Sequence, residues 1–165
     1  MKITLSIQSV ADGVYALGAL HAATASASGA TGKPSGPVPS LLRREHFQSL
    51  RRVCRDVFAS IAIELLPMAT ACNLNENAAN DGDILEIEID ERQSRPDSNT
   101  LHTLRILAEA AMTAGVMHLA FASADHDLSE NFEGEFMRAT ETIRIILRDA
   151  CRAEGAMRRK TAHSG

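Results

Sequence analysis

One stretch of the chain, from about Thr100 to Ser123, constrains the fold more than any other. Projected as a helix at about 100° per residue, it carries two apolar arcs separated by a narrow polar wedge. The wedge consists of His102, Arg105, Glu109 and Thr113. A helix that is apolar over most of its circumference has to be enclosed by other elements. The sequence therefore predicts a helix at the centre of a bundle.

The composition suits closely spaced helices in one domain. Of the 165 residues, 26 are alanine, 6 are aromatic and none is tryptophan. This length is enough to bury a core without disulfides or metals. We predict a single helical domain over residues 1–155 and a flexible tail over 156–165. Small residues, glycines and prolines over 25–39 predict a mobile loop within the domain.

Three further segments show helical periodicity. They begin near Ser9, Ser40 and Asp127, and the last of them is expected to end near Glu154. In the second of these helices the apolar spacing continues from Phe47 to Cys72, and Pro67 predicts a kink or a break. For the central helix, residues 97–99 supply candidate N-caps.

Two segments, near residues 2–7 and 84–90, alternate between apolar and polar side chains, which is typical of strands. We expect them to pair, because a lone strand leaves its backbone groups without partners. Lys2 would then face carboxylates of the second strand. The predicted fold class is α+β, mainly α, with a four-helix core and a small two-stranded sheet.

The three cysteines, Cys54, Cys72 and Cys151, fall on predicted helices and form no C-x-x-C pair. An odd number of such cysteines favours reduced, buried thiols and a cytoplasmic location. The most apolar window, Ala110–Ala124, has 15 residues, fewer than the roughly 20 needed to span a membrane. We therefore predict a buried helix there and no membrane association.

The N-terminus offers a weaker alternative to this location. Residues 25–27 resemble a signal-peptidase site, but Gln8 and Asp12 interrupt the early apolar stretch. A secretory signal normally carries an uninterrupted apolar region before its cleavage site. The cytoplasm remains the expectation.

Histidines supply the first candidates for chemistry. His21 and His118 both lie on apolar helical stripes, which is typical of core histidines. A metal bound between the two would need carboxylates nearby. Asp125-His126-Asp127 has ligand-like composition, but Asp127 is explained as a helix cap. We predict no metal site and no cofactor.

Catalytic candidates are equally few. Arginines flank Cys54 and could lower its thiol pKa, but its central place on an apolar stripe favours burial. A general acid–base site would need a pocket that joins His118 to Glu64 or Glu109. We predict no catalytic residues and no enzymatic activity.

Charge is distributed unevenly along the chain, and this is its strongest functional signal. There are 14 arginines and 3 lysines, and arginine suits planar, bidentate contacts. Residues 76–97 hold 8 acidic residues against two arginines. The candidate interaction face comprises Arg44, Arg51, Arg52, Arg55, Glu86, Glu88 and Asp90.

Three interpretations of this face stay open. The charges could be solvated surfaces that contribute little. They could join copies of the chain head to tail, which closes a ring or grows a filament. The arginines, with the basic residues at 158–160, could instead bind a phosphate backbone. The net charge of −4 and the lack of interleaved aromatic residues favour protein over nucleic acid.

The predicted function is that of a non-catalytic assembly or interaction protein, oligomeric, with protein as its partner. In layout the chain resembles the small helical proteins that bridge head and tail in phages. That resemblance implies self-association, no catalytic residues and a structural role in a phage or mobile element. The alternative is a nucleic-acid-binding accessory protein that uses the arginine-rich face of the second helix.

Overall fold

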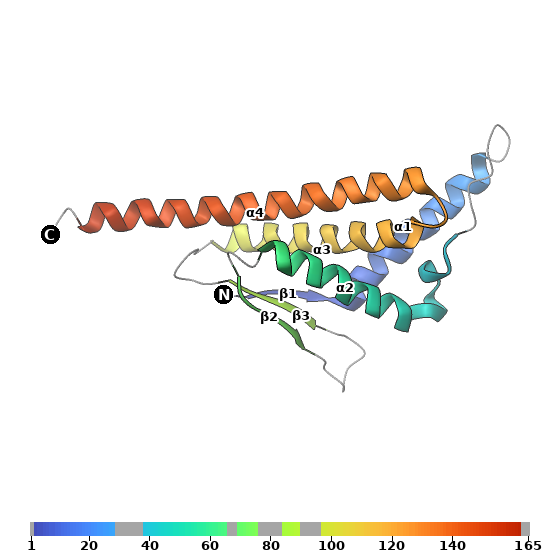
Figure 1. The fold of residues 1–165 in the computed structure, drawn as a ribbon, viewed down its shortest axis with the longest axis horizontal. Coiled ribbons are helices and arrows are strands. Elements are labelled where there is room, and N and C mark those ends of the chain that lie inside the picture. Colours follow the sequence, from blue (N-terminus) through green and yellow to red (C-terminus); the bar gives the residue numbers. More distant parts are fainter. Residues whose placement is uncertain (1, 29–37, 66–68, 76–83, 90–96, 163–165) are drawn as a thin grey trace.

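The computed structural model describes residues 2–28, 38–65, 69–75, 84–89 and 97–162, and the side-chain environments of most of these. The chain begins with β1 (Lys2–Ser6) and α1 (Ile7–Ser28). Two 3-10 turns, Ser40–Leu42 and Arg44–His46, then lead into α2 (Phe47–Leu65). The remaining elements are β2 (Ala69–Asn75), β3 (Ile84–Ile89), α3 (Ser98–Phe121) and α4 (His126–Ala162). The predicted mainly helical α+β fold is confirmed (Figure 1).

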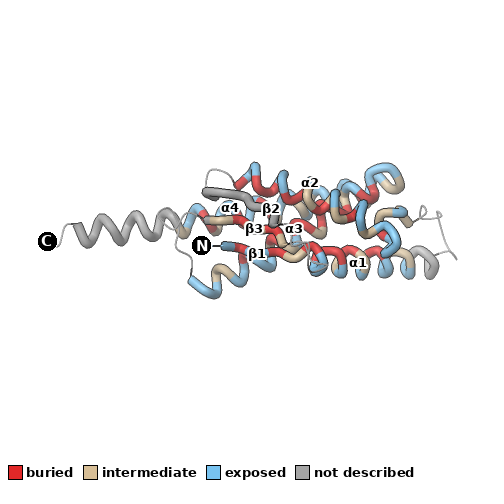
Figure 2. The backbone as a smooth tube through the Cα atoms, turned by 90° about the horizontal axis from the view of Figure 1, so that it is seen from below, coloured by how far each residue is buried: buried red, intermediate tan, exposed pale blue. Residues whose placement is uncertain are grey.

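Helix α3 is the centre of the molecule, as its two apolar arcs predicted. Ten of its 24 residues are buried. Helix α4 packs along the length of α3, and α1, α2 and β1 contact α3 from other sides (Figures 1 and 2). By length and composition α3 is the one helix among the described residues that could cross a membrane. Its enclosure by the other elements is that of a core helix.

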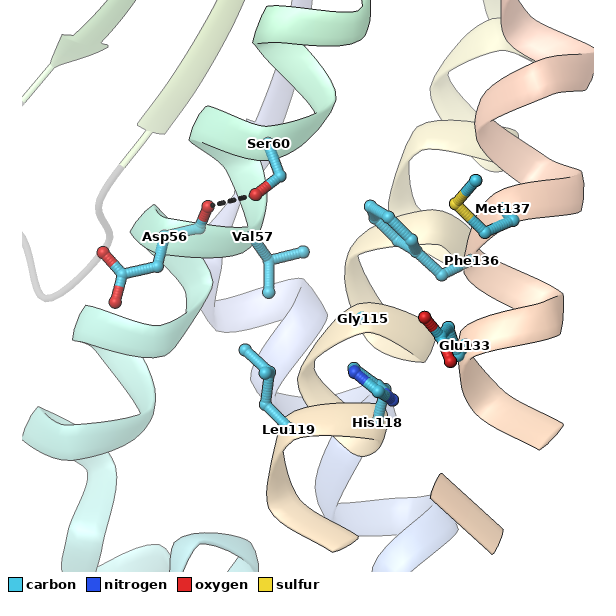
Figure 3. Close-up of a pocket in the computed structure, with 9 residues that line it drawn as sticks. All are labelled: Asp56, Val57, Ser60, Gly115, His118, Leu119, Glu133, Phe136 and Met137. Carbon is cyan, nitrogen blue, oxygen red and sulfur yellow. Dashed lines mark hydrogen bonds between the residues drawn. The ribbon is translucent and has the colours of Figure 1, made fainter. Parts of the chain in front are cut away.

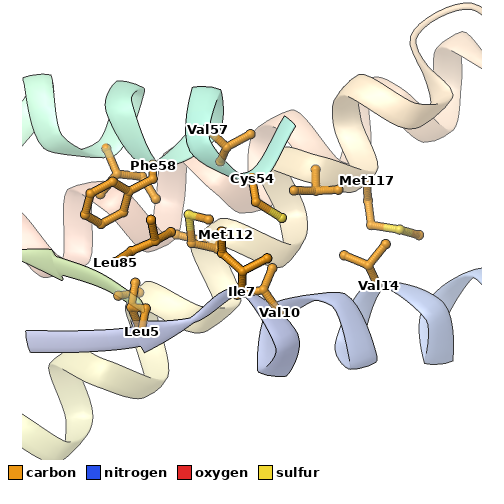
Figure 4. Close-up of a cluster of buried hydrophobic side chains, with 14 of the residues drawn as sticks. Leu5, Ile7, Val10, Val14, Cys54, Val57, Phe58, Leu85, Met112 and Met117 are labelled. Carbon is orange, nitrogen blue, oxygen red and sulfur yellow. The ribbon is translucent and has the colours of Figure 1, made fainter. Parts of the chain in front are cut away.

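The core is continuous from the sheet to the far end of α3. Figure 4 shows Leu5 of β1 and Leu85 of β3 beneath Phe58 of α2, with Met112 of α3 between the layers. Further along, Cys54 is a completely buried thiol among these side chains, as predicted. One core therefore joins the sheet to all four helices.

Three helices approach one another closely at Gly115 of α3. A Cβ atom there would lie 2.6 Å from Val57 Cγ1 of α2 and 3.0 Å from Phe136 Cδ2 of α4. Real Cβ atoms essentially never have neighbours as near as 2.6 Å. Only glycine therefore lets α2 and α4 approach α3 together at this level.

We expect Gly115→Ala to destabilise the protein by about 1–3 kcal/mol, because the Cβ would overpack the α2–α3–α4 contact. Gly134→Ala on α4 is the matched control, since a Cβ there meets nothing within 4 Å. Removing that helical glycine should stabilise the protein by about 0.5–1 kcal/mol. Denaturant unfolding measures both, and equal stability of the two variants would contradict the packing argument.

The two predicted strands form and pair. Strand β3 is central in a sheet of order β1-β3-β2, and both of its pairings are antiparallel. Ile3 pairs with Ile87 and Leu5 with Leu85, and all four side chains are buried. This inner face packs on the helices, which explains the alternation of both strands.

A third strand, β2, was not predicted. We expected helical structure to continue to Cys72, but α2 ends at Leu65, so the predicted interruption near Pro67 is a break. Residues 66–68 lie outside the described part. The register of β2 places Cys72 opposite Ile87 and Leu74 opposite Leu85. Cys72 is therefore on a strand and not on a helix, because pairing with β3 outweighs the helical spacing.

Two helices extend beyond the limits expected from the sequence. Helix α1 runs through Ser28, so residues 25–28 of the expected loop are helical, while 29–37 lie outside the described residues. Helix α4 continues past Glu154 to Ala162, through most of the expected tail. Favourable helix propensity outweighs the small, polar composition in both places.

The N-terminus of α3 is capped as predicted. The Asp97 carboxylate accepts a hydrogen bond from the Thr100 backbone N–H, 2.7 Å away. This bond satisfies one of the unpaired amides of the first turn. It also lowers the pKa of Asp97 below its ordinary value of 3.8, because it favours the ionised form.

We expect the Asp97 cap to make stability depend on pH in acid. Because the folded-state pKa is lowered, the contribution is complete above the ordinary pKa and is lost as pH falls through the folded value. Asp97→Asn keeps a capping side chain but cannot titrate. Unfolding curves between pH 2 and 7 should therefore show a shallower loss in the variant, and parallel losses would contradict this assignment.

Candidate functional site

The predicted arginine face is largely engaged within the chain. The guanidinium carbon of Arg44 lies 5.6 Å from the centroid of the Tyr15 ring on α1, a cation–π geometry. Burial raises the pKa of Tyr15, and the nearby Arg44 charge partly opposes that rise. Arg51 and Arg55 are half-buried on α2 and are not free of partners, whereas Arg52 is exposed.

The acidic part of the predicted face lies on β3, a different element from the arginines. Lys2 and Glu86 form an ion pair, with 3.1 Å between Lys2 Nζ and Glu86 Oε2. The expected proximity of Lys2 to carboxylates is confirmed. This hydrogen bond and the Glu86 charge raise the pKa of Lys2. Glu88 is half-buried and also has a partner. Asp90 lies outside the described residues.

His21 packs as the core histidine predicted from its stripe. Its ring meets Phe121 and Phe132 edge-on, with centroids 5.8 and 5.7 Å away. Among the described residues, no group of three or more His, Cys, Asp or Glu side chains could hold a metal ion.

The capping residue of α4 differs from the predicted one. The Asp125 carboxylate accepts the hydrogen bond from the Leu128 amide at 3.1 Å, so Asp125, and not Asp127, caps the helix. His126 lies one turn from Glu130, with 3.1 Å between Nε2 and Oε1. The ligand-like sequence 125–127 is thus explained by the start of a helix.

A groove open to solvent lies where α2, α3 and α4 meet (Figure 3). Its volume is about 260 Å³. The lining residues are Asp56, Val57 and Ser60 of α2, Gly115, His118 and Leu119 of α3, and Glu133, Phe136 and Met137 of α4. We call this feature the α2–α3–α4 groove.

The groove has an apolar floor and exposed apolar edges. Gly115, Val57 and Phe136 pack closely where the three helices meet, and they also line the groove. Leu119 is 47% exposed and Met137 is 59% exposed. Large apolar side chains that border a hollow and face water are typical of a surface that another molecule covers.

His118 is held in place from α4. Its Nδ1 lies 3.1 Å from the Ser129 carbonyl oxygen and 3.0 Å from Ser129 Oγ, and that hydroxyl donates to the His118 carbonyl at 3.0 Å. Because a carbonyl oxygen only accepts, Nδ1 carries the hydrogen. Nε2 is then the ring nitrogen left without a partner in the described part of the chain. Ser129 is buried and serves as a cross-link between the two helices.

Two acidic residues belong to the lining of the groove, and Figure 3 shows that the Asp56 carboxylate points away from its apolar side chains. Asp56 belongs to α2 and Glu133 to α4, and both side chains are exposed. Neither forms an ion pair with a cation of the described residues. The negative charge of Glu133 beside an apolar floor favours a ligand that combines apolar and cationic groups.

The constellation that an acid–base enzyme would have needed does not form. Glu109 lines a separate pocket between α1, α3 and α4, where Arg105 Nε lies 3.3 Å from its Oε1. Glu64 is exposed on α2 and lines neither this pocket nor the groove. His118 shares its groove with Glu133 and Asp56 instead.

The sequence did not predict the groove, because its apolar spacing places Leu119 on a face of the central helix that was expected to be enclosed. Both apolar arcs of α3 were expected to be buried, yet Leu119 and Ile106 are exposed. Met137 lies off the apolar stripe of α4 and is a second indication of a binding edge. The position of Met137 outside the apolar stripe of α4 was the sequence feature that could have indicated the groove.

Comparison of the chain with family models, with curated proteins and with solved structures finds no match. The groove therefore has to be interpreted from its own geometry and chemistry.

We expect Ser129→Ala to destabilise the protein by about 0.5–1.5 kcal/mol, because it removes the hydroxyl hydrogen bonds that join Ser129 to His118 of α3. Ser60→Ala is the control, since Ser60 Oγ bonds only the Asp56 carbonyl of its own helix. That change should stay within about 0.5 kcal/mol. Thermal or chemical unfolding checks both, and a neutral Ser129→Ala would contradict the proposed cross-link.

Proposed function

We propose that this chain is a non-catalytic assembly protein that self-associates through the α2–α3–α4 groove. One observation carries the proposal. Leu119 and Met137 stand exposed at the edges of a groove whose floor is apolar. Covering these side chains gains roughly 25 cal/mol for each Å² of apolar surface removed from water.

The size of the groove supports a protein partner. Its volume of about 260 Å³ lies below the roughly 300–1,000 Å³ typical of small-molecule sites. It is large enough to receive an apolar side chain from a neighbouring protein surface. Binding of this kind places one anchor residue in a pocket and surrounds it with a polar rim.

The biological setting stays part of the proposal. We place the protein in the cytoplasm, as a structural component of a phage or mobile element, on the resemblance in layout described above. Nucleic-acid binding by the arginine face is the alternative, but Arg44 stacks on Tyr15 and Arg51 and Arg55 are half-buried. These contacts leave fewer cations for phosphates, so protein assembly is favoured.

The proposal predicts that the chain forms oligomers that depend on Leu119. Leu119→Glu places a charge on an edge that the partner would cover, and should weaken self-association by more than about tenfold. Ile106→Glu is the matched control, because Ile106 is equally exposed on α3 but lies outside the groove. Sedimentation velocity over a range of concentrations measures the effect.

Two results would overturn the proposal. One is a wild-type chain that remains a monomer of 17.8 kDa at every concentration. The other is equal loss of association in the two variants, which would place the contact away from the groove. Circular dichroism establishes that both variants keep their helices.

A further inference from the structure

A second hollow lies between α1, α3 and α4, and it shares no lining residue with the α2–α3–α4 groove. We call it the α1–α3–α4 pocket. Its volume is about 320 Å³, which lies at the lower end of the roughly 300–1,000 Å³ typical of small-molecule sites. The pocket therefore suits a small ligand, whereas the groove is below this range.

Small residues leave this space between the helices. Gly13 of α1 lies over Thr113 of α3, where a Cβ on the glycine would be 3.4 Å from Thr113 Oγ1. Ala110 and Ala114 supply the adjoining surface of α3. Helices α1 and α4 both pack on α3 but make few contacts with each other. A space therefore remains above the short side chains of α3.

One part of the pocket lining is apolar and ordered. Phe132 of α4 lines the pocket and is 7% exposed. Its ring stacks on that of Phe121, with 6.2 Å between centroids, and meets the His21 ring edge-on. Leu17 of α1 lies one turn before His21 and also lines the pocket. These side chains offer a fixed surface to a hydrophobic group.

The polar side chains of the lining are mostly hydrogen-bond acceptors. They are Ser9, Glu109, Thr113 and Glu135. Ionised carboxylates only accept hydrogen bonds. The Thr113 hydroxyl already donates its hydrogen to the Glu109 carbonyl oxygen, 2.9 Å away. Three of these four side chains therefore offer oxygen lone pairs and no hydrogen.

The negative charge of the lining is only partly balanced within the chain. Arg105 Nε lies 3.3 Å from Glu109 Oε1, but the Arg105 side chain is 57% exposed, and exposed pairs of this kind are weak. Glu135 is exposed and forms no ion pair within the described part of the chain. No Arg, Lys or His is among the described residues that line the pocket.

From the volume, the apolar surface and the excess of acceptors, we propose that the α1–α3–α4 pocket binds a small organic cation, a primary ammonium group on a short apolar body. An ammonium group has three N–H donors and no acceptor. It matches the carboxylates of Glu109 and Glu135 and the hydroxyl oxygen of Thr113. The apolar body lies against Phe132 and Leu17. This site is separate from the groove of the proposed function.

Two probes of the same shape test the proposal. They are 2-phenylethylammonium chloride and 2-phenylethanol, which has the same apolar body without the charge. The methyl resonances of Thr113 and Ala114 in ¹H–¹³C spectra report binding inside the pocket. We expect saturable shifts with the ammonium compound and binding of the alcohol that is weaker by about tenfold or more, because hydrogen bonds between ionised groups are the stronger ones.

Three variants locate the binding. Glu135→Gln removes one carboxylate with little change of shape and should weaken binding of 2-phenylethylammonium about tenfold. Glu141→Gln is the matched control, because Glu141 is exposed on the same helix but lines neither hollow. Ala110→Leu fills the pocket from an exposed position of α3 and should abolish saturable binding. Circular dichroism and thermal unfolding without ligand establish that all three variants keep the fold.

Three outcomes would overturn the proposal. Equal affinity for the two probes would show that the pocket selects only an apolar body. Equal weakening by Glu135→Gln and Glu141→Gln would show attraction to the acidic surface as a whole. The absence of saturable shifts at Thr113 and Ala114 would show that the pocket does not take this class of ligand. None of these results bears on self-association, which the Leu119→Glu experiment tests.

Discussion

The contact on which the rest of the structure depends is the meeting of three helices at Gly115. Val57 of α2 and Phe136 of α4 occupy the space that a Cβ on this residue would need. Protein interiors are close-packed, so a single methyl group there would push at least one helix outward. The same three residues line the α2–α3–α4 groove. The packing that stabilises the bundle and the shape of the proposed binding surface therefore have one origin.

Polar contacts then hold the groove in a defined shape. Ser129 joins the start of α4 to His118, and Asp125 caps the same end of α4. These contacts fix α4 relative to α3 in the absence of a partner. A surface that is already ordered loses less conformational freedom on binding, which leaves more of the burial energy for association.

The charged residues divide into two groups with different roles. Lys2 with Glu86, and Arg44 with Tyr15, are paired inside the chain, where they join neighbouring elements. Exposed pairs of this kind contribute little to stability. Glu133 has no such pairing within the described residues and borders an apolar surface, so under the proposed function it is the charge best placed to select a partner. The groove thus carries its charge on residues outside the predicted interaction face.

Residue spacing and local hydrogen bonds were enough to predict the central helix, the alternation of two strands and the cap at Asp97. Tertiary structure alone decided that residues 69–75 join the sheet, since a strand needs a partner whose identity its own sequence does not contain. It also decided that Leu119 faces water, because the neighbouring helices leave one part of an apolar arc of α3 uncovered. Periodicity tells which residues share a helical face. How much of that face is covered depends on where the neighbouring helices lie.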